Sequence, residues 1–352
     1  MATPLDGYSD DDSDLDAAAL RVLFRDMTPV AVSPAPAAGI PYTPEFVTVL
    51  GLVRAATAAD EVSPRALLAT AAALVHHNAA DYSVWEYRRR VVRQLAQRAA
   101  DDAAAAAAAA AAKGCSSSDG RGGCDAAAAA ATAAVYAEEL KFTFRVGRCA
   151  EKSYQVWHHR RLIAAVASTA AVEADYVAAF HAADPKNYHA WAHRQWAAAY
   201  WAVDPVSEVE YADALLTDDV RNNSAWAHRH FALVRLPGLA AVAHTAGEAT
   251  AAGEATAGEE ASAAAPPARP SPSAPDEADR LAAACPTELA YATAALRRVK
   301  DNRSAWAYLL WWARVADPPT RAAVIADVGA LVAEAPTARL PPVMLGRLRS
   351  LG

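Results

Sequence analysis

The most regular feature of the chain is a tryptophan that recurs within segments of helical periodicity. From about Glu45 onward, apolar residues recur every three to four positions, as in amphipathic helices. Five segments share one register: Tyr82-Ser83-Val84-Trp85, Tyr154-Gln155-Val156-Trp157, Tyr188-His189-Ala190-Trp191, Asn223-Ser224-Ala225-Trp226 and Arg303-Ser304-Ala305-Trp306. Trp157, Trp191 and Trp226 are 34 and 35 residues apart, the length of a helix–turn–helix repeat. The pattern predicts an all-α fold, an α-α superhelix in which about five or more helical hairpins form a crescent-shaped solenoid.

Polar residues four positions before the tryptophans predict where these helices begin. Asn187 and Asn222 occupy this position in two segments, and Asp81 and Ser153 occupy it in two others. Side chains of these types accept hydrogen bonds from the first free backbone N–H groups of a helix. We therefore expect all four to be N-caps, with the tryptophan about one turn further on and facing inward.

A second helix in each repeat is predicted from the segment that follows Trp191. Ser207-Glu208-Val209-Glu210 has the sequence of a capping box, in which a hydroxyl and a carboxylate cap one helix start reciprocally. Tyr211 and Leu215 would lie on one apolar face of this helix. Each repeat is therefore expected to contain two helices.

An arginine follows each of the first four tryptophans by three residues: Arg88, Arg160, Arg194 and Arg229. We expect these arginines to pair with carboxylates or loop carbonyls between repeats, because a planar guanidinium group makes paired hydrogen bonds better than lysine does. Contact with a ligand is the alternative. In the last segment Leu309 and Leu310 replace the arginine and its neighbour, as is typical of a terminal repeat.

Two stretches of low complexity interrupt the repeats. Residues at about 101–134 are mostly alanine around a Gly/Ser/Cys segment, and residues at about 244–277 are rich in Ala, Gly, Glu, Pro and Ser. The tryptophans that flank these stretches are 72 and 80 residues apart, and neither gap contains a second Trp–Arg motif. We favour insertions that form surface loops over the alternative of a degenerate extra repeat in each gap.

The first 45 residues are predicted to be largely extended or disordered, and residues 46–352 to form the helical-repeat domain. Five prolines between positions 29 and 44 oppose a stable helix there. The acidic start, Met1–Asp16, lacks the apolar run of a signal peptide. The long apolar runs elsewhere are alanine, so we expect no membrane span and a cytoplasmic location.

Charge and cysteine content limit the class of protein further. The net charge of −7 gives no indication of a nucleic-acid partner. The four cysteines, which include no C-x-x-C pair, are Cys115, Cys124, Cys149 and Cys285. They predict neither a disulfide framework nor a zinc site. The adjacent pairs His76-His77 and His158-His159 cannot readily chelate one metal from one helix face, and we expect them at the surface or in hydrogen bonds between repeats.

The candidate chemistry lies in polar residues at the helix starts. Lys152, Tyr154 and Gln155 occupy one such turn, and Tyr188 and His189 occupy the next. Stacking would bring these turns to one edge, where lysine, tyrosine and histidine near helix N-termini suit a phosphate group. A solvated or partner-contacting edge is the alternative. The chain has no G-x-S-x-G, P-loop or H-E-x-x-H motif. This predicts a scaffold that contributes to an active site but does not contain a complete one.

Several strings resemble the repeats of protein prenyltransferase α subunits. They are residues 78–89 (NAADYSVWEYRR), 154–161 (YQVWHHRR), 186–196 (KNYHAWAHRQW) and 219–229 (DVRNNSAWAHR). The likeness runs from FRDMTPV at 24–30, through IPY at 40–42, to about Leu310, and is nearest to the α subunit shared by farnesyltransferase and type I geranylgeranyltransferase. The resemblance implies a crescent of helical hairpins around a β subunit of one or both enzymes.

The resemblance also implies an activity. The heterodimer would transfer farnesyl or geranylgeranyl from its diphosphate to the cysteine of C-terminal Cys-a-a-X (CaaX) proteins. It implies no cofactor on this chain, because the zinc that activates the cysteine belongs to the β subunit, with magnesium supporting the diphosphate. A metal-bound thiol is deprotonated and nucleophilic at neutral pH, and the leaving diphosphate needs cations and donors.

Residue roles follow from the resemblance by matching motifs. Lys152 would contact the diphosphate and assist its departure, with Tyr154 beside it. Tyr188 and His189 would line the same region.

Recognition of the protein substrate also follows from the resemblance. Gln155 would hydrogen-bond the terminal carboxylate of the substrate, and Tyr82 would border the pocket for its last residue. The chain departs from the usual Lys-Asn-Tyr at Ser153, and from the usual proline-containing approach at Cys149-Ala150-Glu151. Because serine also caps helices, we expect the turn to be preserved.

Two other functions compete with this one. The α subunit of a Rab-type geranylgeranyltransferase is disfavoured by the FRDMTPV segment and by the absence of a large appended domain after the fifth repeat. A non-catalytic helical-repeat adaptor is disfavoured because it would not need Lys152, Tyr154 and Gln155 together.

Overall fold

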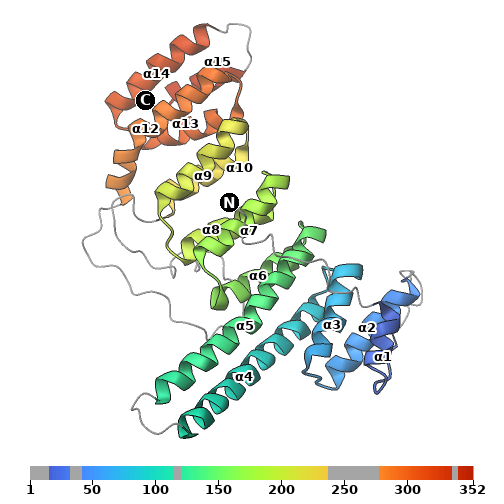
Figure 1. Ribbon diagram of the computed structural model, residues 1–352. Helices are drawn as coiled ribbons and strands as arrows, with labels where there is room; N and C mark the ends of the chain where they lie inside the picture. Colours follow the sequence, from blue (N-terminus) through green and yellow to red (C-terminus); the bar gives the residue numbers. More distant parts are fainter. Residues whose placement is uncertain (1–15, 32–41, 114–119, 237–276, 335–339, 352) are drawn as a thin grey trace. The chain divides into compact units, whose positions relative to one another are not determined.

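The described part of this computed structural model comprises residues 16–31, 42–113, 120–236, 277–334 and 340–351. Every regular element in these ranges is a helix (Figure 1), which confirms the predicted all-α fold. The chain divides into two compact units, Met1–Ser168 and Thr169–Gly352, and each is described by itself. The predicted crescent would depend on how the units are placed, and it stays a prediction.

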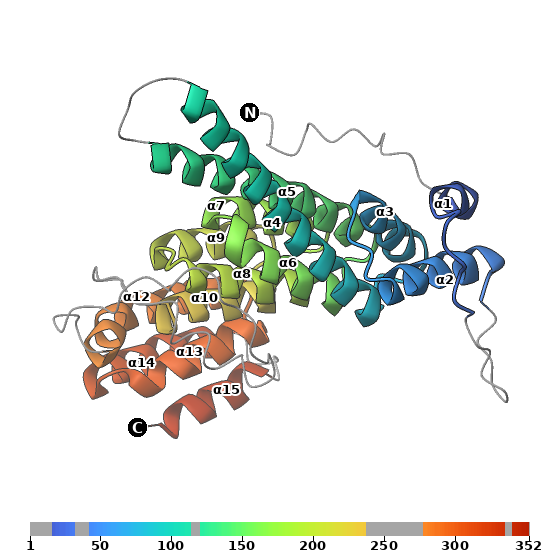
Figure 2. The same ribbon diagram turned by 90° about the horizontal axis from the view of Figure 1, so that it is seen from below.

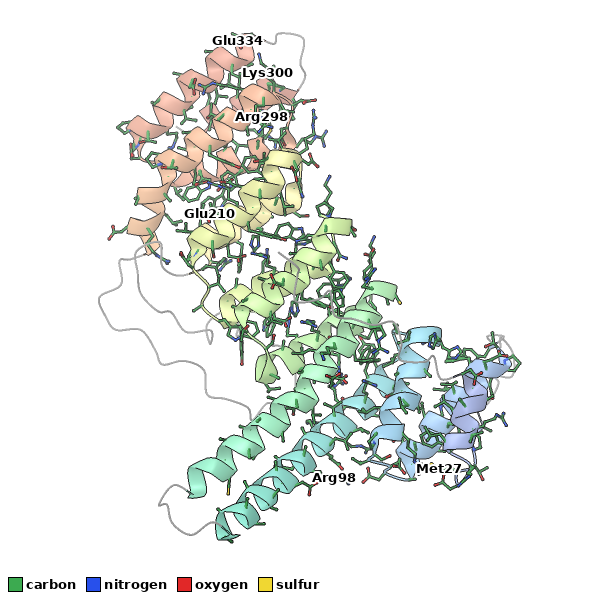
Figure 3. The ribbon with its side chains drawn as sticks, in the orientation of Figure 1. Met27, Arg98, Glu210, Arg298, Lys300 and Glu334 are labelled. Carbon is green, nitrogen blue, oxygen red and sulfur yellow. The ribbon has the colours of Figure 1, made fainter. Side chains whose placement is uncertain are left out.

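Unit 1 contains the first seven of the described helices. They are α1 (Ala17–Leu23), α2 (Pro44–Ala58), α3 (Pro64–Ala72), the π-helix η1 (Ala73–His77), α4 (Tyr82–Lys113), α5 (Gly120–Cys149) and α6 (Tyr154–Ala167). Its core includes Phe24 directly after α1, Trp85 from α4 and Val146 from α5. Arg98 on α4, labelled in Figure 3, donates to the Val62 carbonyl at 2.6 Å, so the turn between α2 and α3 is anchored to α4.

Unit 2 contains the remaining described helices. They are α7 (Ala170–Ala183), α8 (Tyr188–Tyr200), α9 (Pro205–Asp218), α10 (Asn223–Val234), α12 (Glu277–Arg298), α13 (Arg303–Val315), α14 (Pro318–Ala333) and α15 (Leu340–Arg349). Trp191, Trp226 and Trp306 lie in one continuous core. At the surface, Lys300 and Glu334 lie together in Figure 3 and form an ion pair at 3.0 Å.

The recurring tryptophans define two kinds of helix. We call α4, α6, α8, α10 and α13 the Trp helices, and α5, α7, α9 and α12, which alternate with them, the Glu helices. Among the described residues, α5 is the one helix between α4 and α6, so that gap contains a single hairpin. Residues 237–276, which include most of the second low-complexity stretch, lie outside the described residues.

The alanine-rich stretch 101–134 differs from the surface loop expected. Apart from residues 114–119, it lengthens α4 and α5 into antiparallel helices that run side by side past α3 and α6 (Figures 1 and 2). Ala103 and Ala104 on α4 and Ala127 and Ala128 on α5 are half-buried, whereas the residues on either side of each pair are exposed. Alanine has the highest helix propensity, and each helix supplies the packing surface that an isolated alanine helix lacks. We call the segments 99–113 and 120–138 the alanine arm.

The N-terminal segment also differs from the extended chain expected. Residues Ala17–Leu23 form α1, whose N-cap Asp16 accepts a hydrogen bond from Ala19 N at 2.7 Å. Leu20 and Phe24 are fully buried against the rest of unit 1, so packing stabilises a helix too short to persist alone. The predictions for residues 1–15 and 32–41 concern positions outside the described residues.

Candidate functional site

Every Trp helix is tied to the turn before it by the same hydrogen bond. The indole Nε1 donates to the carbonyl oxygen six residues earlier, at 2.8–2.9 Å, in the pairs Trp85–Ala79, Trp157–Glu151, Trp191–Pro185, Trp226–Val220 and Trp306–Lys300. All five tryptophans are at most 4% exposed. The inward-facing position predicted for them is confirmed, and the bond fixes the shape of each turn.

Three of the four predicted N-caps are confirmed. Oδ1 of Asn187 and Oδ1 of Asn222 each accept from two backbone N–H groups at the start of α8 and α10, and Asp81 does the same for α4. Asn222 has a second role, because its Nδ2 donates at 3.2 Å to the Pro185 carbonyl that also accepts from Trp191. The cap residue therefore joins its own helix to the turn of the preceding repeat.

Ser153 does not cap α6, so that prediction is wrong. Its side chain accepts no backbone hydrogen bond, although α6 still begins at Tyr154. Oγ instead lies 3.2 Å from the Ala79 carbonyl oxygen and 3.1 Å from Oε1 of Gln155. The Ala79 carbonyl, which also accepts from Trp85, competes with the helix for the short serine side chain. Ser153 thus keeps the bond to the preceding repeat and loses the cap.

The arginines after the tryptophans pair with buried carboxylates, as the sequence predicted. Two nitrogens of each guanidinium bind two carboxylate oxygens at 2.7–2.8 Å, in the pairs Arg88–Glu139, Arg194–Glu208 and Arg229–Glu288. Arg160 donates to the Leu140 carbonyl and to Thr143 Oγ1 at 2.9 and 3.0 Å. These contacts support the structural interpretation of the arginines over contact with a ligand.

The second partner of each buried glutamate was not predicted from the sequence. A histidine or tyrosine two residues after the next tryptophan binds the same carboxylate at 2.6–2.7 Å, in the pairs Glu139–His159, Glu173–His193, Glu208–His228 and Glu288–Tyr308. The partners in each pair are 20 residues apart, and this constant spacing could have identified them. His159 thereby confirms the hydrogen bond between repeats expected for one member of its pair.

The same network corrects the capping box predicted at Ser207. Helix α9 begins at Pro205, and its cap is Asp204, which accepts from Val206 N. Ser207 lies inside the first turn and donates to the Asp204 carbonyl at 2.7 Å. Glu208 is 4% exposed and faces Arg194 and His228. The buried ion pair therefore decides which way this glutamate points.

Burial and charge set the ionisation of this network. Burial by itself raises the pKa of Glu139, but the positive charge of Arg88 and hydrogen bonding from His159 outweigh it and lower the pKa to about 2. Burial lowers the pKa of His159 and that of His228. A neutral imidazole that donates from Nε2 to an ionised glutamate fits both directions. The network is a structural ion-pair system joining successive helices.

The predicted site residues of unit 1 lie at the starts of two Trp helices. Tyr82 and Tyr154 are the first residues of α4 and α6, and they are 60% and 57% exposed. The Tyr154 ring stacks on His158, with ring centroids 5.9 Å apart. Lys152 lies in the turn before α6, with a side chain 68% exposed. Gln155, the second residue of α6, is half-buried beside Ser153.

The backbone of unit 1 brings these turns together. Ser153 reaches the Ala79 carbonyl in the turn before α4. The rings of Trp85 and His159 also pack against each other between α4 and α6, with centroids 4.5 Å apart and an interplanar angle of 36°. The turns that carry Tyr82 and Lys152 are therefore neighbours, held together by the contacts of Ser153 with Ala79 and of Trp85 with His159.

Tyr188 and His189 belong to unit 2. Tyr188 is the first residue of α8 and is 76% exposed, and its ring meets that of His189 with centroids 5.5 Å apart. The two residues occupy the same register in α8 as Tyr154 and Gln155 in α6. Their approach to Lys152 would join the two units, and it stays a prediction.

The position of Lys152 relative to its tryptophan recurs in unit 2, where the residue has a structural role. Lys186, five residues before its tryptophan as Lys152 is, forms an ion pair with Asp219 at 2.9 Å. Arg221 has the same position in the next repeat and pairs with Asp301 at 2.9 Å. Cations at this position can therefore link successive turns, and Lys186 provides a matched comparison for Lys152.

Metal binding requires clustered ligand side chains, and membrane insertion requires a long apolar helix. The described residues contain no group of three or more His, Cys, Asp or Glu side chains placed to hold a metal ion. None of the described helices is both long and apolar enough to cross a membrane. Cys124, Cys149 and Cys285 are free thiols.

Comparisons with known proteins agree with the repeats that the tryptophans define. Residues 136–165, 180–201 and 205–236 match the family model "Protein prenyltransferase alpha subunit repeat". A stretch of 78 residues is 40% identical to the "Protein farnesyltransferase/geranylgeranyltransferase type-1 subunit alpha" of Pisum sativum. That stretch covers 22% of this chain and 23% of the length of the relative, so the matched part spans about a quarter of that protein.

A solved structure has a similar fold. It is described as "Candida albicans protein geranylgeranyltransferase-I complexed with GGPP", and the likeness has a TM-score of 0.56 at 22% sequence identity. The likeness covers 83% of this chain and 74% of that one. The Trp85 and Trp306 repeats lie outside the segments matched by the family model, yet they make the same indole hydrogen bond as the matched repeats.

Proposed function

We propose that this chain, whose matched segments are prenyltransferase α-subunit repeats, is the α subunit of a heterodimeric protein prenyltransferase. The heterodimer would transfer farnesyl or geranylgeranyl from its diphosphate to the cysteine of a C-terminal CaaX sequence. Its partner would be the β subunit of farnesyltransferase, of type I geranylgeranyltransferase, or of both. We place this activity in the cytoplasm.

The observation that carries the proposal is the contrast between buried and exposed residues of the Trp helices. The Arg and His side chains of these helices are buried and bind buried glutamates of the Glu helices. At the starts of the same helices, Tyr82, Tyr154 and Lys152 are exposed. Large aromatic side chains exposed at one position of successive helices contribute nothing to the core, and such residues are common at binding surfaces.

In this proposal Lys152 contacts the diphosphate and stabilises the negative charge that grows as it leaves. An ammonium group at the start of a helix provides a cation together with free backbone N–H groups. The Tyr154 hydroxyl would donate beside it, and Tyr188 and His189 would line the same region. These four side chains would favour departure of the diphosphate and would not attack the prenyl group.

Gln155 and Tyr82 would recognise the protein substrate. The Gln155 amide can donate to the terminal carboxylate of the CaaX sequence, because a carboxylate only accepts hydrogen bonds. Tyr82, at the start of α4, would border the pocket for the last residue. The zinc that activates the cysteine would be held by the β subunit, and magnesium would support the diphosphate.

The test is co-expression of this chain with a farnesyltransferase or a type I geranylgeranyltransferase β subunit. Prenyl transfer to a CaaX peptide is measured for each pair and for each subunit alone. The proposal expects activity only in a pair, and the active pair would identify the prenyl group.

Two results would contradict the proposal. A stable complex that transfers neither prenyl group would indicate a helical-repeat scaffold without an active site. Failure to bind either β subunit, with binding to the Rab-type β subunit instead, would assign the chain to that enzyme.

A further inference from the structure

A surface pocket of about 240 Å³ lies between α7, α8 and α9 of unit 2. Alanines of α7 and α8 form most of its wall, and Glu173, Arg194 and Glu208 are among its polar lining residues. Ala171 and Ser207, which also line it, are exposed, so the pocket is open to solvent. None of the residues assigned to the proposed prenyl-transfer site is among those that line it. Its occupant is therefore a separate question.

The guanidinium of Arg194 differs from its counterparts in one nitrogen. Nε and Nη2 bind Glu208 at 2.8 Å. In the equivalent arginines the remaining nitrogen, Nη1, donates to a side-chain oxygen on an earlier helix at 2.6–3.0 Å, in the pairs Arg88–Thr70, Arg160–Thr143 and Arg229–Asp213. Among the described residues of α7, Arg194 Nη1 has no such acceptor. Since Arg194 lines the pocket and its other two nitrogens are bound, Nη1 is the donor that this arginine offers to a ligand.

The sequence of α7 explains the difference. Thr143 Oγ1 and the Leu140 carbonyl on α5 both accept from the arginine of their repeat, and the corresponding residues on α7 are Val177 and Ala174. Val177 is fully buried and has no hydroxyl. Ala174, shorter than leucine, lines the pocket. The two replacements remove an acceptor and leave open space on the same side of Arg194.

Burial makes the remaining donor valuable to a ligand. Arg194 is 7% exposed, and the ring of Tyr211 covers one face of its guanidinium, with Cζ 3.3 Å from the ring centroid. A ring face attracts the cation from above and leaves the in-plane N–H groups to other acceptors. A poorly solvated donor gains more from an acceptor than an exposed one does.

We propose that this pocket binds a small neutral molecule with an apolar body and one carbonyl oxygen, which accepts from Arg194 Nη1. The alanine methyl groups favour an apolar body. An anion would be repelled by Glu173 and Glu208, and a cation would be repelled by Arg194 and would lack the acceptor that Nη1 needs. A cavity of about 150 Å³ holds benzene, so a ring of five or six atoms with its oxygen fits here. The inference does not rest on the proposed function.

The experiment compares two probes of the same shape. Cyclopentanone has the ring and the carbonyl oxygen, and methylenecyclopentane has a CH2 group in place of that oxygen. Ligand-observed NMR titration of the full chain measures the Kd of each. The ketone is expected to bind at least about fivefold more tightly, the size of one hydrogen bond.

Variants of α7 locate the binding. Val177→Thr places a hydroxyl where Thr143 has one, so it is expected to weaken the ketone about fivefold and the alkene less than about twofold. Ala174→Leu fills the space and is expected to abolish binding of both probes. Val172→Thr is the matched control, because Val172 is exposed on the same helix and does not line the pocket, and both affinities should be unchanged. Thermal unfolding of each variant without a probe checks that it is folded.

Each remaining outcome would overturn the inference. Equal affinity for the two probes would mean that Nη1 contributes nothing, and lack of saturable ketone binding would mean that water alone occupies the pocket. A ketone affinity that Val177→Thr leaves unchanged, or that Val172→Thr lowers equally, would place the binding elsewhere. Binding that persists in folded Ala174→Leu would do the same. If Ala174→Leu does not fold, the comparison of the two threonine variants decides.

Discussion

Glu139 on α5 binds His159 on α6, with Oε1 2.6 Å from Nε2. The same carboxylate holds the Arg88 guanidinium from α4 through two bonds of 2.8 Å. One side chain, 3% exposed, therefore joins three successive helices. Glu208 repeats the arrangement with Arg194 and His228, so the buried carboxylate is the structural link between repeats.

Removal of this carboxylate should be costly. Glu139→Ala leaves Arg88 buried without its counter-ion, and we expect a loss of about 3–5 kcal/mol in the free energy of unfolding. Glu138→Ala is the control, because Glu138 forms an exposed ion pair with Lys141 and should cost less than about 1 kcal/mol. Urea unfolding of the full chain measures both. Similar losses for the two variants would contradict the role of Glu139.

The network also predicts acid sensitivity. The pKa of Glu139 falls from 4.5 to about 2 on folding, and that of His159 falls below 6.5. Both groups therefore bind protons more readily in the unfolded chain, so stability is complete above these ordinary values and declines as the pH falls. We expect the free energy of unfolding to decrease from about pH 6.5 downward, and further below 4.5 as Glu139 loses its contribution.

A substitution separates the histidine part of this acid response. His159→Gln keeps a donor toward Glu139 without a titrating imidazole, so it should reduce the slope of stability between about pH 7 and 5. Urea unfolding at several pH values measures it. A wild-type protein that gained stability as the pH fell through this window would refute the argument.

Gly51 on α2 should resist substitution. A Cβ there would lie 3.0 Å from the Val30 carbonyl oxygen and 3.1 Å from Pro29 Cβ, and Gly51 O accepts from Val30 N at 3.0 Å. We expect Gly51→Ala to displace the Pro29–Val30 segment and cost about 1–3 kcal/mol. Hydrogen exchange of the Val30 amide measures the displacement.

Gly346 on α15 provides the matched control for that substitution. A Cβ at Gly346 meets nothing within 4 Å, so Gly346→Ala should stabilise its helix by up to about 1 kcal/mol. Equal protection of the Val30 amide in Gly51→Ala and wild type would show that the close approach is not required.

The part of the alanine arm that lies between residues 101 and 134 should be dispensable for folding. Joining Ala100 to Val135 through a short glycine-containing turn removes residues 101–134 and leaves Arg88 and Glu139 in place. Since the arm buries mainly alanine methyl groups, we expect unfolding free energy to change by less than about 1–2 kcal/mol. Circular dichroism and urea unfolding measure the result. Loss of the folded state would mean that the arm supports the repeats.

Lys152 and Lys186 offer a matched test of the proposed chemistry. Lys152→Ala should lower the rate of prenyl transfer on the order of tenfold or more, because a cation near the leaving diphosphate is lost. Lys186 has the same register and pairs with Asp219, so Lys186→Ala should change the rate less than about twofold, as for a surface ion pair. Steady-state kinetics of the heterodimer and its assembly by size-exclusion chromatography measure both. Equal effects of the two variants would remove Lys152 from the diphosphate site.

The sequence by itself determined the features that depend on neighbours along the chain. The Trp indole reaches a carbonyl only six residues away, and Asn187 and Asn222 cap amides two and three residues ahead. These bonds join residues that are close along the chain, so residue type and spacing sufficed to predict the two caps, although the indole bond itself was not predicted. They fix the start of each Trp helix and the exposed positions of Tyr154 and Tyr188.

Only the tertiary structure decided the features that depend on which helices pack together. The Arg88–Glu139 pair spans 51 residues and the Arg229–Glu288 pair spans 59, so low-complexity stretches hide the partners from any fixed spacing. Ser153 had the residue type of a cap, but the Ala79 carbonyl, 74 residues away in sequence, lies within reach of its hydroxyl. The alanine arm is helical because α4 and α5 pack along each other. At Ser153 a contact distant in sequence competes with a local preference of similar energy, whereas in the alanine arm the packing adds to a local preference for helix.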